Sequence, residues 1–155
     1  MAEADVTDAA RPEARPNGLQ QLQAMMAGRT AAPTMAKTLG FTLVEIEEGR
    51  AVFEGAPSEA VYNPLGTVHG GYAATLLDSA IGCAVHSRLA PGQGYTTLEL
   101  KVAFHRPLTK QVGPVRAEGN LVQFGRRAAF GEGRLTDANG RLYATATSTL
   151  LVFEQ

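Results

Sequence analysis

The stretch NPLGTVHGGYAATLLDSAIGCAVHS, residues 63 to 87, is the most informative segment of this chain. After its glycine pair it is apolar at nearly every position, which predicts a helix from His69 to about Arg88. A helix that is hydrophobic all round is typical of a buried one, so we expect it at the centre of the molecule. One carboxylate, Asp78, interrupts the run, and burying a lone charge is costly unless something compensates it.

Strand patterns follow the helix to the end of the chain. Residues 96 to 107, TTLELKVAFHRP, alternate strictly between apolar and polar side chains, which is typical of a half-buried strand. One face of this strand carries Leu98, Leu100, Val102 and Phe104, and the other carries Thr97, Glu99, Lys101 and His105. Three more strands are predicted at residues 115–125, 126–137 and 141–154, with a hairpin turn at 138–140.

The chain before the central helix divides into three parts. Residues 1 to 17 are rich in alanine, proline and charge without periodicity, and we interpret them as a disordered tail. Residues 18 to 32 are predicted to be a helical extension, with a helix ending at Gly28. Residues 33 to 155 form the main domain, which opens with a short helix and two strands turning at Glu48-Gly49.

This order of elements predicts an α+β fold in which an antiparallel sheet curls around a long central helix. Parallel βα units do not alternate along the chain, which argues against a doubly wound nucleotide-binding fold. A length of 155 residues suits one domain of this kind with a real core.

Composition narrows the classes of partner. A formal net charge of −1 gives no electrostatic case for nucleic acid. No apolar stretch reaches the roughly 18 residues of a membrane span or forms a signal peptide, so we expect a cytoplasmic protein without a membrane partner. The single cysteine, Cys83, excludes a disulfide framework, and no histidine spacing indicates zinc, so no metal is expected.

NPLGTVHGG leading into the helix and TTLELKVAFHRP after it resemble the hotdog-fold acyl-CoA thioesterases, most closely the phenylacetate-pathway (PaaI-like) branch. The resemblance covers residues 33 to 153. It implies hydrolysis of an acyl-CoA thioester, with an aryl or medium-chain acyl group, to the free acid and coenzyme A. It implies no cofactor, because coenzyme A is part of the substrate, and a homodimer or homotetramer as the assembly.

Thioester hydrolysis requires an attacking water or carboxylate and donors for the developing oxyanion. Gly70 stands at the predicted helix start, where N–H groups have no intrahelical partner and the helix dipole favours negative charge. Because glycine also allows a carbonyl to approach the backbone closely, the Gly70 N–H is the candidate oxyanion donor, the role that the matching glycine has in the family. Gly71 is a candidate substrate contact. The alternative is that both glycines only permit a tight entry into the helix.

Asp78 is the candidate base or nucleophile. In the related enzymes the acidic residue at this position either orients water or attacks the thioester, and the sequence does not choose between these roles. A carboxylate hydrogen-bonded to backbone or hydroxyl groups is the structural alternative. The resemblance further implies that His69 and Asn63 position the thioester and the water, and Thr97 aligns with a hydroxyl-bearing position.

The segment Gly125, Arg126 and Arg127 lies at a predicted turn between strands. Arginine binds phosphate well, and related thioesterases hold the coenzyme A nucleotide with this region, so these residues are the candidate phosphate site. Ordinary solvated arginines are the alternative interpretation.

Helix geometry predicts a shared site. Gly70 and Asp78 are eight residues apart, a rise of about 12 Å along an α-helix, so they cannot serve one thioester from the same helix. An antiparallel helix from a two-fold-related subunit would bring its Asp78 beside Gly70. The small residues Gly71, Ala74 or Thr75, and Gly82 recur on one stripe with Asp78 and would let that helix or a thin acyl chain approach, although a tightly packed sheet would explain the stripe too.

Two other functions remain open on the same fold. One is an acyl-thioester dehydratase, which depends on a histidine paired with a helix-borne acid. The other is an acyl-CoA-binding or regulatory module without catalysis.

Overall fold

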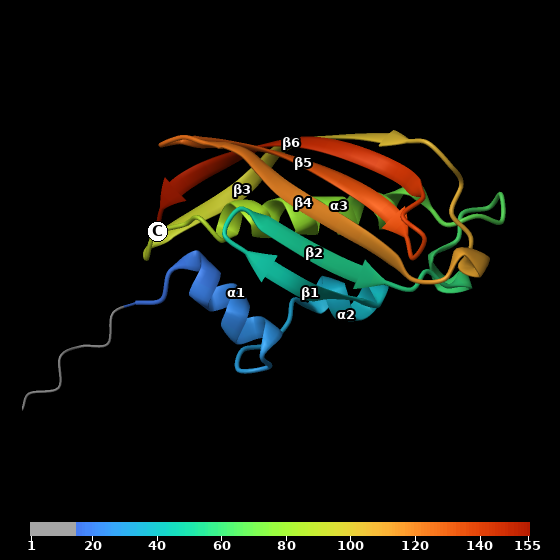
Figure 1. Cartoon of the computed structure of the whole chain (residues 1–155), viewed down its shortest axis with the longest axis horizontal. Helices are drawn as coiled ribbons and strands as arrows, with labels where there is room; N and C mark the ends of the chain where they lie inside the picture. Colours follow the sequence, from blue (N-terminus) through green and yellow to red (C-terminus); the bar gives the residue numbers. More distant parts are fainter. Residues whose placement is uncertain (1–14) are drawn as a thin grey trace, which may run out of the picture.

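A long helix, α3 (Gly70–His86), lies against one face of a six-stranded sheet in the computed structural model (Figure 1). Every neighbouring pair of strands is antiparallel, in the order β1-β2-β4-β5-β6-β3. The strands are β1 (Phe41–Glu47), β2 (Arg50–Gly55), β3 (Gln93–Phe104), β4 (Val115–Phe124), β5 (Ala128–Asp137) and β6 (Leu142–Glu154). This architecture confirms the predicted α+β hotdog fold.

Two short helices precede the sheet and lie beside β1 (Figure 1). α1 (Gly18–Met26) begins with a capping box, in which Asn17 and Gln20 exchange side-chain-to-backbone hydrogen bonds. α2 (Thr34–Leu39) ends at Gly40, whose φ of 69° is the left-handed conformation that glycine adopts readily. The remaining elements are the 3-10 turns η1 (Glu59–Val61) and η2 (Lys110–Val112).

The structure describes residues 15 to 155. Most of the predicted disordered tail, residues 1 to 17, therefore lies outside the described residues.

The core lies between α3 and the sheet, and both contribute to it. At Gly119 of β4 the sheet comes so close to the helix that a Cβ would lie 2.2 Å from the carbonyl carbon of Ala80. Only glycine allows two backbones to approach this closely, so the glycine-containing strands let the sheet wrap tightly around α3. The largest fully buried side chains are Leu76, Leu77, Ile81, Val85, Val52, Val115, Leu135 and Leu150.

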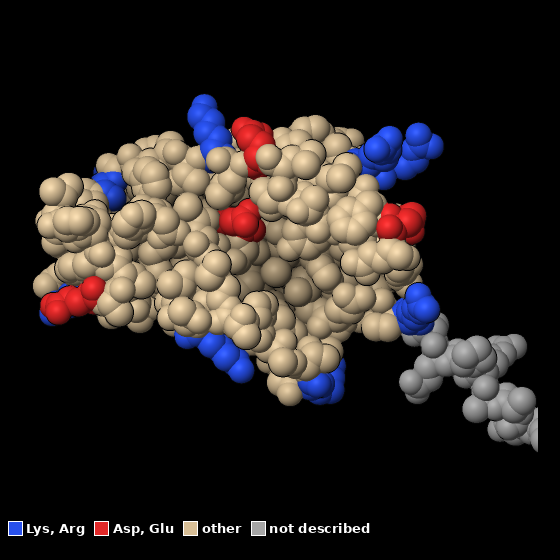
Figure 2. Space-filling model, turned by 180° about the vertical axis from the view of Figure 1, so that it is seen from behind, with Lys and Arg blue, Asp and Glu red and all other residues tan. Residues whose placement is uncertain are grey.

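One side of α3 is left open by the sheet, so the prediction of a helix buried all round was wrong. Gly71 is exposed, and Ala74, Thr75, Asp78 and Ser79 are only partly buried. Gly82, which was expected on the same open stripe, is instead buried against Tyr95 of β3. Seen from the side opposite to Figure 1, the molecule has a hollow near the middle of a surface with few charged side chains (Figure 2). The apolar pattern did not reveal this side because small residues look the same in sequence whether a sheet covers them or not.

β3 departs from strict alternation at a bulge. Thr97 pairs with Leu150 and Glu99 with Thr149, so Leu98 is an extra residue between two successive pairs. The bulge turns Thr97 to the inner face, where its hydroxyl reaches α3. The prediction that Thr97 shares a face with Glu99 was therefore wrong, because one inserted residue reverses the direction of every side chain on one side of it.

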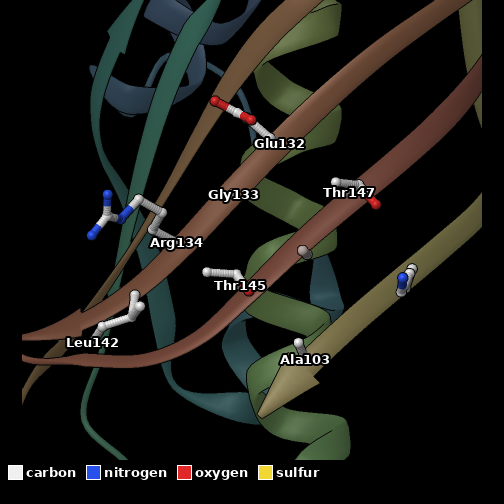
Figure 3. A pocket seen from close by; sticks show the side chains of 9 residues that line it. Ala103, Glu132, Gly133, Arg134, Leu142, Thr145 and Thr147 are labelled. Atoms are coloured by element: carbon white, nitrogen blue, oxygen red, sulfur yellow. The ribbon is translucent and has the colours of Figure 1, made fainter. Parts of the chain in front are cut away.

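The outer face of the sheet, away from α3, carries both polar and apolar exposed side chains. Between β3, β5 and β6 it has an open hollow of about 460 Å³ (Figure 3). Glu132 and Arg134 of β5 and Lys101 of β3 stand around Thr145 and Thr147 of β6. Because α3 lies against the opposite face, this hollow is separate from the helix residues that the sequence analysis singled out.

Candidate active site at the start of α3

Asn63 holds the loop that leads into α3. Its side-chain oxygen accepts hydrogen bonds from the N–H groups of Leu65 (3.0 Å) and Thr67 (3.2 Å), and its amide nitrogen donates to the Thr67 hydroxyl (2.9 Å). An amide oxygen has two acceptor positions, and here the loop uses both. Asn63 therefore shapes the path of the chain into the helix and keeps one amide hydrogen for other contacts.

His69 is the N-cap of α3. Its Nδ1 accepts a hydrogen bond from the Gly71 N–H at 2.8 Å, and its carbonyl oxygen accepts one from the Tyr72 N–H at 3.0 Å. Because Nδ1 is an acceptor, the neutral imidazole carries its proton on Nε2. The exposed ring of His69 can therefore offer an N–H donor to a molecule bound at the helix start.

The Gly70 N–H is left without a partner. His69 takes the N–H groups of Gly71 and Tyr72, whereas no acceptor for the Gly70 N–H is found among residues 15 to 155. This N–H stands at the positive end of the helix dipole. The cap thus distinguishes the two glycines, because only Gly70 keeps a free donor for a negatively charged oxygen.

A pocket of about 310 Å³ opens beside Gly70. Its walls include the buried side chains of Val68, Ala73, Leu108 and Tyr143. An apolar pocket with one unpaired N–H in its wall suits an apolar group joined to a carbonyl or an oxyanion.

Asp78 lies two turns further along α3 and is the single acidic residue of that helix. The Thr97 hydroxyl donates a hydrogen bond to its Oδ1 at 3.0 Å, so one carboxylate oxygen is held by β3. Burial, with a contribution from the Asp78 carboxylate, raises the pKa of the Cys83 thiol to about 12. Cys83 therefore stays protonated at neutral pH and is unsuited to act as a nucleophile.

One chain does not bring Gly70 and Asp78 together. Both lie on the continuous helix α3, eight residues apart, which corresponds to about 12 Å along the helix axis. The cap, the free N–H and the pocket are at one end, and the Asp78–Thr97 pair is near the middle.

The turn of the hairpin between β4 and β5 consists of the partly buried Gly125 and the exposed Arg126 and Arg127. The guanidinium of Arg88, just beyond α3, lies 5.9 Å from the ring centroid of Phe124, the last residue of β4. The arginine turn therefore lies at the C-terminal end of α3, away from Gly70 of the same chain.

Phe104 is a pocket residue that the strand pattern did not single out. It is the last residue of β3, its side chain is 57% exposed, and a Cβ on Gly70 would lie 3.0 Å from its ring. In the sequence Phe104 is one more apolar position of an alternating strand. Its place beside Gly70 depends on how β3 crosses α3.

Within residues 15 to 155, no group of three His, Cys, Asp or Glu side chains is arranged to hold a metal ion. The same part of the chain has no helix with the length and apolar character needed to cross a membrane.

Comparison with known proteins gives a consistent result. Residues 65 to 144 match the model of the thioesterase superfamily. The chain is 26% identical to 1,4-dihydroxy-2-naphthoyl-CoA hydrolase of Listeria monocytogenes over 76% of its length and 94% of that protein. It is 29% identical to human acyl-coenzyme A thioesterase 13, over 84% of its length and 93% of that protein. A solved structure of a phenylacetic acid degradation-related protein from Ralstonia eutropha superimposes with a TM-score of 0.76 and 30% identity, covering 84% of this chain and 98% of that one.

Proposed function

This chain belongs to the thioesterase superfamily, and we propose that it hydrolyses acyl-CoA thioesters at a site built around Gly70 and Asp78. The observation that carries the proposal is the unpaired Gly70 N–H beside an apolar pocket of about 310 Å³. The acyl group, aryl or medium-chain, occupies this pocket, and coenzyme A lies outside it.

The carbonyl oxygen of the thioester accepts a hydrogen bond from the Gly70 N–H. When a nucleophile adds to the carbonyl carbon, this oxygen becomes negatively charged, and the N–H and the helix dipole stabilise it. The Nε2–H of His69 is a second donor at the same helix end, and Asn63 positions both by holding the preceding loop.

Asp78 supplies the attack in one of two ways. As a general base, it takes a proton from a water whose oxygen adds to the carbonyl carbon. As a nucleophile, its carboxylate adds directly and forms an anhydride that water then hydrolyses. In both cases the C–S bond breaks, the coenzyme A thiolate leaves and takes up a proton, and the free acid is released. Thr97 holds Asp78 through its 3.0 Å hydrogen bond.

The site is completed by a second copy of the chain. The open side of α3, with Gly71, Ala74 and Thr75 beside Asp78, lets another helix approach. β3 is also an edge strand of 12 residues, and such a long unpaired edge favours pairing with another chain. An antiparallel, two-fold-related α3 would set Asp78 of the partner subunit beside Gly70, giving a homodimer with two composite sites, alone or within a homotetramer.

The same two-fold symmetry indicates which subunit's arginines bind the coenzyme A phosphates. Arg126 and Arg127 lie at the C-terminal end of α3, and in an antiparallel pair of helices that end of one subunit is nearer to the N-terminal end of the other. The arginine turn of the partner subunit, with its Gly125, would therefore hold the coenzyme A phosphates. Replacing both arginines by alanine should raise KM for coenzyme A thioesters more than for short thioesters that lack the nucleotide.

The test of the activity is thiol release from a panel of acyl-CoA thioesters, followed with a thiol reagent. Release of free coenzyme A is expected from aryl or medium-chain substrates. Binding of acyl-CoA without release would contradict hydrolysis and favour a binding module, and formation of an unsaturated acyl-CoA would favour a dehydratase.

The test of the shared site is complementation. An Asp78→Asn subunit is mixed with a His69→Ala/Gly70→Ala subunit, each weakly active alone. Mixed dimers should regain about one working site of two, because each contributes the half that the other lacks. Mixtures that stay inactive while subunits demonstrably exchange, or an active monomer, would contradict the shared site.

A further inference from the structure

Backbone hydrogen bonds hold two walls of the pocket beside Gly70. The backbone of the segment that follows β3 is held to β6, since the N–H of His105 donates to the carbonyl of Tyr143 at 2.8 Å. The opposite wall is held in the same way, since the N–H of Val68 donates to the carbonyl of Leu108 at 2.9 Å. These hydrogen bonds leave the pocket little freedom to widen through its backbone.

The side chain of Phe104 lines another side of the pocket. The far edge of its ring rests against Gly70, because a Cβ on Gly70 would lie 3.0, 3.3 and 3.6 Å from the ring atoms Cζ, Cε1 and Cε2. Behind it the pocket is lined by small, buried side chains, Ala73 at 3% and Ala144 at 1% exposure, whereas Phe104 itself is 57% exposed. The ring is thus a bulky, exposed group at the lip of the pocket, next to the small residues Gly70, Ala73 and Ala144.

We propose that Phe104 is a specificity-determining residue, whose ring limits the width of an acyl group next to its carbonyl carbon. This inference rests on the proposed function, because the carbonyl is placed by the Gly70 N–H. An acyl group that reaches the pocket from this carbonyl must pass the ring within its first atoms. Straight chains and flat aryl rings fit this passage edge-on, whereas a methyl branch makes the carbon next to the carbonyl tetrahedral and wider, so that it collides with the ring edge.

The narrow space between the Phe104 ring and Gly70 explains why the residue at position 70 must be small. Any side chain there would press on Phe104, and the narrowest part of the pocket would close further. Gly70 therefore has two tasks, presenting its N–H and leaving room for the ring.

The experiment measures a selectivity ratio. The two substrates are the best-hydrolysed unbranched acyl-CoA of the panel and its 2-methyl derivative, and the ratio is kcat/KM for the branched over the unbranched compound. Phe104→Ala should raise this ratio at least about tenfold, since pocket contacts with one carbon group discriminate by about 10- to 200-fold.

Phe130→Ala is the matched control. Phe130 is also a partly exposed aromatic residue (44%) but belongs to β5 and lines a hollow on the outer face of the sheet. This variant should leave the ratio unchanged.

The molar mass of each variant in solution distinguishes the alternatives. A Phe104→Ala protein that hydrolyses both substrates with the wild-type ratio overturns the inference and leaves the proposed function standing. A uniform loss on both substrates together with a changed molar mass also overturns it, since Phe104 would then serve the assembly alone. A wild-type protein that releases no thiol from any substrate contradicts the proposed function itself and this inference with it.

Discussion

The two ends of α3 differ in how their backbone groups are satisfied. At the N-terminal end the Gly70 N–H has no acceptor among the described residues, whereas at the C-terminal end α1 and Ser87 donate hydrogen bonds to backbone carbonyls. The N–H of Gly18 donates to the Leu89 carbonyl just beyond the helix at 3.0 Å, and the Ser87 hydroxyl donates to the Ala84 carbonyl at 2.7 Å. One end is thus left open and the other is closed by the chain itself.

The histidines at the two ends of α3 differ in the same way. His69, at the open end, is exposed, and one ring nitrogen remains available. His86, at the closed end, is partly buried, its Nε2 lies 2.9 Å from the Gln21 Oε1 of α1, and its ring packs edge-on against Tyr95. Helix ends that are satisfied within the chain contribute to stability, whereas an end left unsatisfied is available for a ligand.

The largest effect is expected on the open side of α3. Asp78→Asn should lower kcat by at least about 100-fold, the usual scale for losing a positioned acid–base group, with little change in the melting temperature. Ser79→Ala, a change at the neighbouring partly buried position, is the control and should keep wild-type turnover. Near-wild-type hydrolysis by the asparagine variant would remove Asp78 from the mechanism.

The next effect concerns the closed end. A Cβ on Gly18 would lie 1.7 Å from the carbonyl oxygen of His86, so Gly18→Ala must displace α1 from α3. We expect a loss of about 1–3 kcal/mol in the free energy of unfolding, the scale of overpacking a well-packed contact. Chemical denaturation measures it, with Gln23→Ala on the exposed side of α1 as the control. An unchanged unfolding midpoint would mean that α1 does not close this helix end in solution.

Gly70→Ala makes the corresponding change at the open end. Here the added Cβ meets the tip of the Phe104 ring at 3.0 Å, an overlap that a movement of a few tenths of an ångström relieves, whereas the 1.7 Å overlap at Gly18 involves a backbone carbonyl. Stability should therefore stay close to wild type, while kcat/KM falls by about tenfold, since displacing reacting groups by up to 1 Å can cost as much as about 100-fold. Equal losses of stability at Gly18 and Gly70 would abolish the contrast between the two ends.

The smallest effect is the pH dependence at the closed end. Burial lowers the pKa of His86 below its ordinary value of 6.5, so the unfolded chain binds this proton at a higher pH than the folded chain. Stability therefore falls as the pH decreases through 6.5, and the loss levels off below the folded-state pKa. His86→Gln should flatten this part of the curve of melting temperature between pH 7 and pH 5. A curve that stays parallel to that of the wild type would show that His86 does not contribute.

Local pattern was sufficient for the elements of this fold. The apolar run after His69 predicted α3, and the alternating segments predicted the strands, since both patterns report which residues of one short segment face the core. The turn at Glu48-Gly49 was also predicted from local sequence, by its turn residues, and Gly49 has the positive φ of 80° that favours glycine.

In the candidate site, too, some features follow from local sequence and others depend on the folded conformation. The free Gly70 N–H follows from its position at a helix start, which a sequence can reveal. Which of the two glycines keeps a free N–H depends on the His69 side chain, which caps Gly71. The Asn63 side-chain oxygen accepts hydrogen bonds from Leu65 and Thr67 because of the loop conformation, which residue types alone do not determine.

Residue pattern alone was enough to predict the helix, the strands, the resemblance to thioesterases and the candidate site residues. Three features became visible only in the folded chain: a bulge turns Thr97 toward Asp78, Phe104 lies beside Gly70, and one side of α3 stays open. The physical reason is that periodicity is a property of neighbouring residues. Register, bulges and the edge at which a sheet ends depend on contacts between segments far apart in the chain.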